Sequence, residues 1–163
     1  MTEKAISVGL GELHISKDPE KVLVCYGLGS CVGVSFYDPL LKLGALAHVV
    51  LPSSSMARVQ DSLAKFADTC IPTMLQEITK MGANKSRLIV KIAGGAQVLK
   101  LPGQANRLDI GGRNISAVEE ALAAEKLVVG NKDVGGNYGR TMQLYIGTGI
   151  VTIRTVGQGE KEL

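Results

Sequence analysis

Short apolar runs rich in Val, Leu and Ala, each closed by turn residues, occupy the first third of the chain and predict β-strands. The turn signals include the segment Ser16–Glu20, the Asp38-Pro39 pair and Pro52. Because closely spaced strands are joined most economically by hairpins or by sheet-to-sheet connections, a sheet-rich beginning is expected. The predicted strands cover residues 5–15, 21–26, 30–38 and 41–52.

A change of apolar spacing to every third or fourth residue predicts a helix over Val59–Met81. Pro72 lies inside this pattern, so we expect a kink or break near Cys70 and Ile71. The positions on the predicted apolar face are Val59, Leu63, Phe66, Cys70, Met74, Ile78 and Met81.

The second half of the chain returns to strand patterns around one further helix. Residues 87–95 predict a buried strand that ends in two glycines. Ser116 followed by Glu119 matches a capping box, which predicts a helix running to about Glu125. We interpret residues 1–163 as one mixed α/β domain, richer in strand than in helix, without repeats or a linker. The remaining predicted strands cover residues 127–131, 140–147 and 149–156.

Composition narrows the class of protein. The chain has 163 residues, of which 45% are hydrophobic and 20% charged, so it is large enough and apolar enough to bury a core. We find no apolar run of about 18 residues, which a membrane span needs, and no secretory signal at the beginning. These features predict a soluble, cytoplasmic protein without membrane insertion.

Charge and residue counts disfavour nucleic-acid and metal binding. The net charge is +3 with the charges dispersed, and aromatic residues make up only 4%, so a basic surface with stacking aromatics is not expected. With three cysteines, no CxxC pair and two histidines, a closed zinc site would need nearly every ligand in the chain. We therefore predict no metal and no nucleic-acid partner.

The segment Gly27–Cys31 places a thiol directly after a glycine-rich turn. It lacks a third glycine at Val32 and any following Gly-Lys-Ser/Thr, so it matches neither standard nucleotide-binding loop. Glycine allows a substrate to approach the backbone closely. The N–H groups around Gly29, Ser30 and Cys31 could thereby stabilise an oxyanion next to a nucleophile.

A cysteine nucleophile needs a base, and the two histidines differ as candidates. His14 lies in an alternating segment that suits a surface strand, whereas His48 interrupts an apolar run in which imidazole needs a hydrogen-bond partner. A thiol on a neighbouring strand is one such partner. Cysteine and histidine in apolar strands are also common core residues, and that interpretation stays open; Cys70 fits it best. A disulfide or redox couple between Cys25 and Cys31 is a further alternative.

Five sequence blocks, in order along the chain, resemble the chemotaxis receptor glutamine deamidases, the CheD family. Together they span nearly the whole chain and are far more specific than a lone cysteine. The blocks are GLGSC at 27–31, G-A-x-A-H-V-x-L-P at 44–52, GGAQ at 94–97, I-G-x-R-N at 110–114 and GG-x-x-GR at 135–140.

The resemblance implies specific roles for residues of these blocks. Cys31 would be the nucleophile and His48 its base, and Gly29 and Ser30 would help to hold the oxyanion. The third catalytic position of the family is commonly Thr, but here it is Cys25. The backbone carbonyl of Cys25 could then accept the imidazole N–H and orient the ring. The implied fold is an α/β sandwich of two packed β layers with helices on one side, similar to the deamidase domain of cytotoxic necrotizing toxins.

The resemblance also implies a reaction and partners. The expected activity is hydrolytic deamidation of glutamine to glutamate on the cytoplasmic helices of chemotaxis receptors, with weak methylesterase activity and no cofactor. Such a substrate favours a shallow groove over a deep pocket. A CheC-type phosphatase is an expected partner. Two alternatives are a non-catalytic regulatory module that binds receptors or such a phosphatase, and a toxin-like deamidase that acts on a GTPase.

Overall fold

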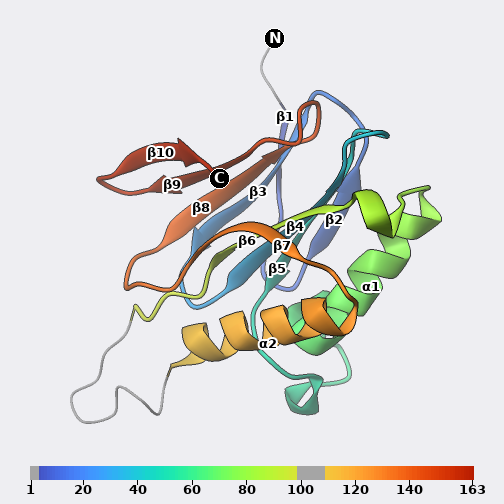
Figure 1. The fold of residues 1–163 in the computed structure, drawn as a ribbon. Coiled ribbons are helices and arrows are strands. Elements are labelled where there is room, and N and C mark those ends of the chain that lie inside the picture. The colour runs from blue at the N-terminus through green and yellow to red at the C-terminus, as the bar shows by residue number, and fades with distance from the viewer. Residues whose placement is uncertain (1–3, 99–108) are drawn as a thin grey trace.

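Within residues 4–98 and 109–163, which the structure describes, two five-stranded β-sheets pack face to face and two α-helices cover one of them (Figure 1). The structure is a computed structural model. The first sheet has the strand order β1-β3-β8-β9-β10, and the second has the order β2-β5-β4-β6-β7. The α/β sandwich expected from the sequence is confirmed.

The elements have the following bounds. The strands are β1 (Lys4–Ser7), β2 (Leu13–Ser16), β3 (Lys21–Leu28), β4 (Val32–Asp38), β5 (Leu43–Val49), β6 (Ile89–Gly94), β7 (Val129–Val134), β8 (Arg140–Tyr145), β9 (Val151–Thr155) and β10 (Gly159–Glu162). The helices are α1 (Ala67–Lys80) and α2 (Ile110–Ala124), with single 3₁₀ turns at Ser54–Met56, Leu63–Lys65 and Lys85–Arg87.

Strand β4 is buried on both faces because it lies between the two halves of the core. Its residues Val32, Val34 and Phe36 pack against the helices, whereas Tyr37 packs against the first sheet. Side chains of a strand alternate between faces, so the odd-numbered positions of β4 face the first sheet. Every residue of β4 and β5 is buried, which explains their nearly continuous apolar sequence.

The strand expected over residues 5–15 is in fact two strands in different sheets. β1 pairs with β3 in the first sheet, and β2 pairs with β5 in the second. A turn separates them, in which the Glu12 N–H donates to the Gly9 carbonyl at 2.9 Å. Gly11 in this turn has a φ of +72°, a conformation that favours glycine. The chain therefore crosses from one sheet to the other where the sequence reads as continuous.

The helix expected over residues 59–81 is shorter, because α1 begins only at Ala67. Val59 is fully exposed rather than part of an apolar face. The reason lies in the backbone: the N–H of Val50 donates to the carbonyl of Lys65 at 2.9 Å. This bond holds the chain before α1 against the end of β5, so Lys65 lies in a separate 3₁₀ turn and not in α1.

The expected apolar face is confirmed within α1 itself. Cys70, Met74 and Ile78 are all buried against the second sheet. Pro72 lies inside the helix, which is continuous across it, so the break that its presence suggested does not occur. Its early position costs only one intrahelical hydrogen bond, that to the carbonyl of Asp68.

Helix α2 begins at Ile110, six residues before the capping box that the sequence suggested at Ser116. Its N-cap is Asp109, whose carboxylate accepts the N–H of Gly112 at 2.9 Å. Ser116 therefore lies in the helix interior and caps nothing. The strands expected over 127–131, 140–147 and 149–156 correspond to β7, β8 and β9, while β10 was not predicted.

Candidate functional site

The turn between β3 and β4, residues 29–31, contains Cys31 and is called the Cys31 turn below. Hydrogen bonds to its backbone carbonyls hold it in place. The Gly29 carbonyl accepts the Ala96 N–H at 2.7 Å, and the Cys31 carbonyl accepts the Gly95 N–H at 2.8 Å. Between them, the Ser30 carbonyl accepts the side-chain Nδ2 of Asn114 at 2.9 Å. All three carbonyls of the turn are thus engaged, which fixes the orientation of its peptide planes.

Two N–H groups of this turn, unlike its carbonyls, have no hydrogen-bond partner among the described residues. Within the described ranges, the N–H groups of Ser30 and Cys31 donate to no backbone or side-chain acceptor. In a planar trans peptide the N–H points away from the carbonyl, so these two donors face away from the bonds that hold the turn. They are the N–H groups that the sequence suggested as oxyanion donors, and that role stays a prediction.

Two glycines allow the rest of the fold to approach this turn. A Cβ on Gly94, which has a φ of +110°, would collide with the Cys31 carbonyl. A Cβ on Gly95 would collide with Ile115 of α2. The buried Arg140 side chain holds the same segment by donating to the Gly94 carbonyl at 3.0 Å. The GGAQ and GG-x-x-GR blocks therefore support the Cys31 turn by packing.

Sheet register brings Cys31 and His48 to the same face of the second sheet. Gly33 of β4 pairs directly with His48 of β5, and Cys31 lies two residues before Gly33. Cys31 itself precedes β4, but its side chain packs against the cluster of buried residues between the two sheets. Both side chains therefore face the interface between the two sheets.

His48 is buried, with 4% of its surface exposed, and one ring nitrogen has a fixed partner. Its Nδ1 lies 2.9 Å from the Val8 carbonyl oxygen. Because a carbonyl can only accept, Nδ1 carries the hydrogen and Nε2 is left as an acceptor. Nε2 is buried and has no hydrogen-bond partner among the described residues. Burial lowers the pKa of His48, although the bond to Val8 opposes this effect.

Cys31 is half-buried at the edge of the cluster of apolar residues between the sheets. Burial raises the pKa of its thiol, because a low-dielectric environment disfavours the thiolate. Together with the lowered pKa of His48, this favours the neutral form of each group. The expectation that His48 ionises Cys31 stays a prediction.

Cys25 lies close to the site but does not orient His48. The imidazole bonds to the Val8 carbonyl, so the expectation that the Cys25 carbonyl accepts this hydrogen is wrong. The Cys25 side chain is fully buried between the sheets, with Sγ 3.9 Å from the Ala47 carbonyl oxygen. Burial raises the pKa of Cys25 strongly, which makes it an inert thiol. All three cysteines are free, so the suggested Cys25–Cys31 disulfide is absent from the structure.

Other sequence candidates lie away from the site. His14 lies on β2 as a partly exposed strand residue, with its Nε2 3.9 Å from Glu12 Oε1. Cys70 is a buried core residue of α1. No group of three or more His, Cys, Asp or Glu side chains suited to a metal ion is found in residues 4–98 and 109–163. In the same ranges no helix has the length and apolar character needed to cross a membrane.

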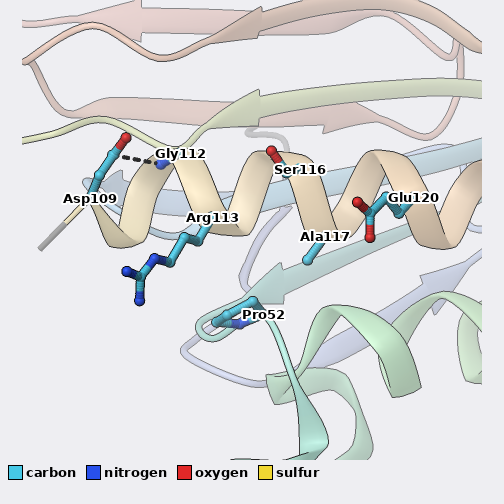
Figure 2. A pocket seen from close by; sticks show the side chains of 7 residues that line it. All are labelled: Pro52, Asp109, Gly112, Arg113, Ser116, Ala117 and Glu120. Atoms are coloured by element: carbon cyan, nitrogen blue, oxygen red, sulfur yellow. Dashed lines mark hydrogen bonds between the residues drawn. The ribbon is translucent and has the colours of Figure 1, made fainter. Parts of the chain in front are cut away.

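A groove lies on the other side of the second sheet, along α2 (Figure 2). It has a volume of about 610 Å³ and runs between the helix and the loop at Pro52. Neither Cys31 nor His48 lines the groove, so a molecule bound there would not be in contact with the thiol. The lining residues are Pro52, Asp109, Gly112, Arg113, Ser116, Ala117 and Glu120.

Sequence reasoning did not identify the hydrogen bonds that Val8 and Asn114 make at this site. Val8 contributes a backbone atom, which leaves no residue signature. Asn114 lies in the I-G-x-R-N block, and it occupies the buried face of α2 with Gly111, Val118 and Leu122. A polar residue at an apolar helical position was the signal that could have identified it.

The family model of CheD, described as chemotactic sensory transduction, matches residues 50–155. A protein of Symbiobacterium thermophilum named "Probable chemoreceptor glutamine deamidase CheD" is 52% identical over 158 residues, covering 96% of this chain and 96% of that protein. A protein of the same name from Syntrophomonas wolfei is 44% identical over 97% of this chain and 98% of its own length. The crystal structure of Bacillus licheniformis hypothetical protein YfiH is 17% identical, with a TM-score of 0.43, and covers 76% of this chain and 49% of that protein. At this level the structural likeness says nothing about function.

Proposed function

The chain belongs to the CheD family, and from this premise we propose that it hydrolyses glutamine side chains of chemoreceptors to glutamate, with Cys31 as nucleophile. The observation that carries the proposal is the Cys31 turn. Its carbonyls are held by the fold, its Ser30 and Cys31 N–H groups are unused among the described residues, and His48 lies on the same face of the sheet. This combination suits acyl transfer.

The reaction begins from the neutral pair. As Cys31 Sγ attacks the carboxamide carbon of glutamine, His48 Nε2 takes the thiol proton. The carbonyl oxygen becomes an oxyanion, which accepts hydrogen bonds from the N–H groups of Ser30 and Cys31, with Gly29 giving the backbone room to approach. The imidazolium then donates its proton to the departing nitrogen, the C–N bond breaks, and ammonia leaves behind a thioester.

The second half of the reaction restores the thiol. His48 Nε2 removes a proton from water, whose oxygen attacks the thioester carbon. The C–S bond breaks, Cys31 recovers its proton and glutamate is released. The Val8 carbonyl stabilises the ring in both halves, because it holds Nδ1–H and keeps Nε2 available for each transfer.

The substrate and partners follow from the same proposal. Glutamines on the cytoplasmic helices of a receptor would reach the thiol from the open side of the half-buried turn. A glutamate methyl ester has a carbonyl that the same thiol could attack, so weak methylesterase activity belongs to the proposal. A CheC-type phosphatase is the proposed regulatory partner, and it would compete with receptor for the surface around Cys31.

Mass spectrometry of a receptor cytoplasmic fragment tests the proposal. The wild-type protein should convert specific glutamines to glutamates, and Cys31→Ala should abolish the conversion. Cys70→Ala is the matched control, since it also removes one free thiol, in α1, and should retain activity. Conversion by Cys31→Ala at the wild-type rate would refute the nucleophile assignment. Receptor binding without conversion by the wild-type protein would favour the non-catalytic regulatory module.

A further inference from the structure

Asn114 joins the Cys31 turn to the residue that directly follows β5, the strand that carries His48. Its side chain is fully buried in α2, and its Nδ2 donates to the Ser30 carbonyl and to the Val50 carbonyl, at 2.9 Å each. A carboxamide nitrogen carries two hydrogens, so both bonds can form at once. The two acceptors also fix the orientation of the amide, because only the nitrogen can face a pair of carbonyl oxygens.

The bond to Ser30 sets the direction of a different group, the Cys31 N–H. The Ser30 carbonyl and the Cys31 N–H belong to one peptide unit, which is planar and trans, so they point in opposite directions. Asn114 holds the carbonyl towards α2 and the strand end. The Cys31 N–H, which has no acceptor in the described part of the chain, is thereby aimed away from the helix.

The buried Asn114 amide also has an unfavourable effect on the stability of the fold. Asn114 Oδ1 is buried and has no hydrogen-bond partner among the described residues. An unsatisfied buried acceptor is unfavourable, because it has lost its hydrogen bonds to water without gaining others. An apolar side chain would fill the same position on α2, between Gly111 and Val118, without that cost. What an apolar residue could not do is hold the two carbonyls.

We propose that Asn114 is a positioning residue that aims the Cys31 N–H at the oxyanion formed during acyl transfer. The inference deepens the proposed function and rests on Cys31 being its nucleophile. Asn114 contacts neither substrate nor reacting atoms; it acts through the peptide between Ser30 and Cys31.

Two chemical probes of Cys31 separate this role from a merely structural one. Iodoacetamide alkylates the thiol by displacement at a saturated carbon, where no oxyanion forms. With p-nitrophenyl acetate, the sulfur attacks the ester carbonyl, an oxyanion forms, and the C–O bond then breaks to release p-nitrophenolate and an acetyl thioester. In Asn114→Ala we expect acetylation to fall about tenfold or more, because an oxyanion donor is misdirected, while alkylation stays within about twofold of wild type.

The controls isolate the effect. Rates are corrected with Cys31→Ala, and Tyr37→Phe serves as the matched variant. It also removes a buried donor to a carbonyl, the 2.7 Å bond from the Tyr37 hydroxyl to Ile146, but at the other end of β4. It should change neither rate. Asn114→Leu replaces the amide by an apolar side chain of similar size and removes both donors, so it should show the same selective loss if the alanine variant fails to fold.

The possible outcomes are distinct. Selective loss of acetylation supports the proposal. Equal loss of both rates, or no loss of either, in a folded Asn114 variant overturns it. Because neither probe requires a receptor, failure of the wild-type protein to deamidate receptor fragments would refute the proposed function and still leave the role of Asn114 decided by the two rates.

Discussion

The Nδ1 atom of His48 lies 2.9 Å from the carbonyl oxygen of Val8, and this contact connects the two sheets next to the candidate site. Val8 follows β1 and donates its own N–H to the Val24 carbonyl at 2.7 Å, which continues the pairing of the first sheet. The acceptor of the imidazole is therefore a rigid backbone atom. It determines the tautomer of His48 more firmly than a rotatable hydroxyl would.

Replacement of His48 by asparagine distinguishes the role of Nδ1 from the role of Nε2. The asparagine amide can donate to the Val8 carbonyl as Nδ1–H does, but it supplies no base in the place of Nε2. We expect His48→Asn to fold, and to deamidate a receptor fragment about 10²- to 10⁴-fold more slowly than wild type, the usual contribution of a general base. Thermal unfolding and ammonia release measure the two properties. Near-wild-type turnover would remove His48 from the mechanism.

The pH dependence of alkylation tests whether Cys31 rests as a neutral thiol. Burial raises its pKa, so at a given pH a smaller fraction is thiolate than in an ordinary peptide. Iodoacetamide labelling of native protein should therefore rise with pH and reach its midpoint above that of a cysteine-containing peptide in the same buffer. A midpoint below that of the peptide would instead indicate a preformed thiolate–imidazolium pair. Cys25 and Cys70 should remain unlabelled until the protein unfolds, because both are fully buried.

The main parts of the site were predictable from the sequence because they lie on buried strands with clear patterns. The apolar runs at 30–38 and 41–52 predict two neighbouring strands, and the pairing of β4 with β5 confirms them. His48 lies on β5, whereas Cys31 lies in the turn directly before β4. The catalytic assignment itself remains a prediction. By contrast, the imidazole acceptor could not be predicted, since any residue can supply a carbonyl.

The two errors in the helices have different causes. Residues from Val59 onwards have helical spacing, but the Lys65 carbonyl pairs with the N–H of Val50, a long-range contact that delays α1 to Ala67. The second error is local: Ser116 has the sequence of a cap, but Asp109 provides the actual one by accepting the N–H of Gly112.

Cys25 should be dispensable for turnover. The resemblance implies a catalytic Thr at this position, but the Val8 carbonyl already accepts the Nδ1–H of His48. We expect Cys25→Ala to lose about 1 kcal/mol of stability from the missing sulfur while its deamidation rate stays within about threefold of wild type. Cys25→Thr, the matched variant, should likewise remain active. A folded Cys25→Ala protein that loses about a hundredfold in rate would restore a direct role for this side chain.

Asp38 should make the stability of the fold sensitive to acid. Its carboxylate is fully buried at the end of β4 and accepts two hydrogen bonds from Arg87, at 3.0 Å from Nε and 2.8 Å from Nη2. The bond to Arg87 is the main reason that its pKa is lowered to about 2. Since the pKa in the unfolded chain is about 3.9, the native state favours the ionised form. The stabilisation is therefore complete above about pH 4 and is lost as the pH falls towards about 2.

Urea unfolding between neutral pH and pH 3 measures this contribution. Asp38→Asn should lower the free energy of unfolding at neutral pH by about 1–3 kcal/mol, because the buried amide replaces a charged acceptor. It should also weaken the decline in stability below about pH 4, since the titrating group is gone. Asp18→Asn provides the matched control: Asp18 is exposed, and its replacement should leave the acid decline unchanged. Parallel stability curves for wild type and Asp38→Asn across this range would show that the Asp38–Arg87 pair does not control the acid response.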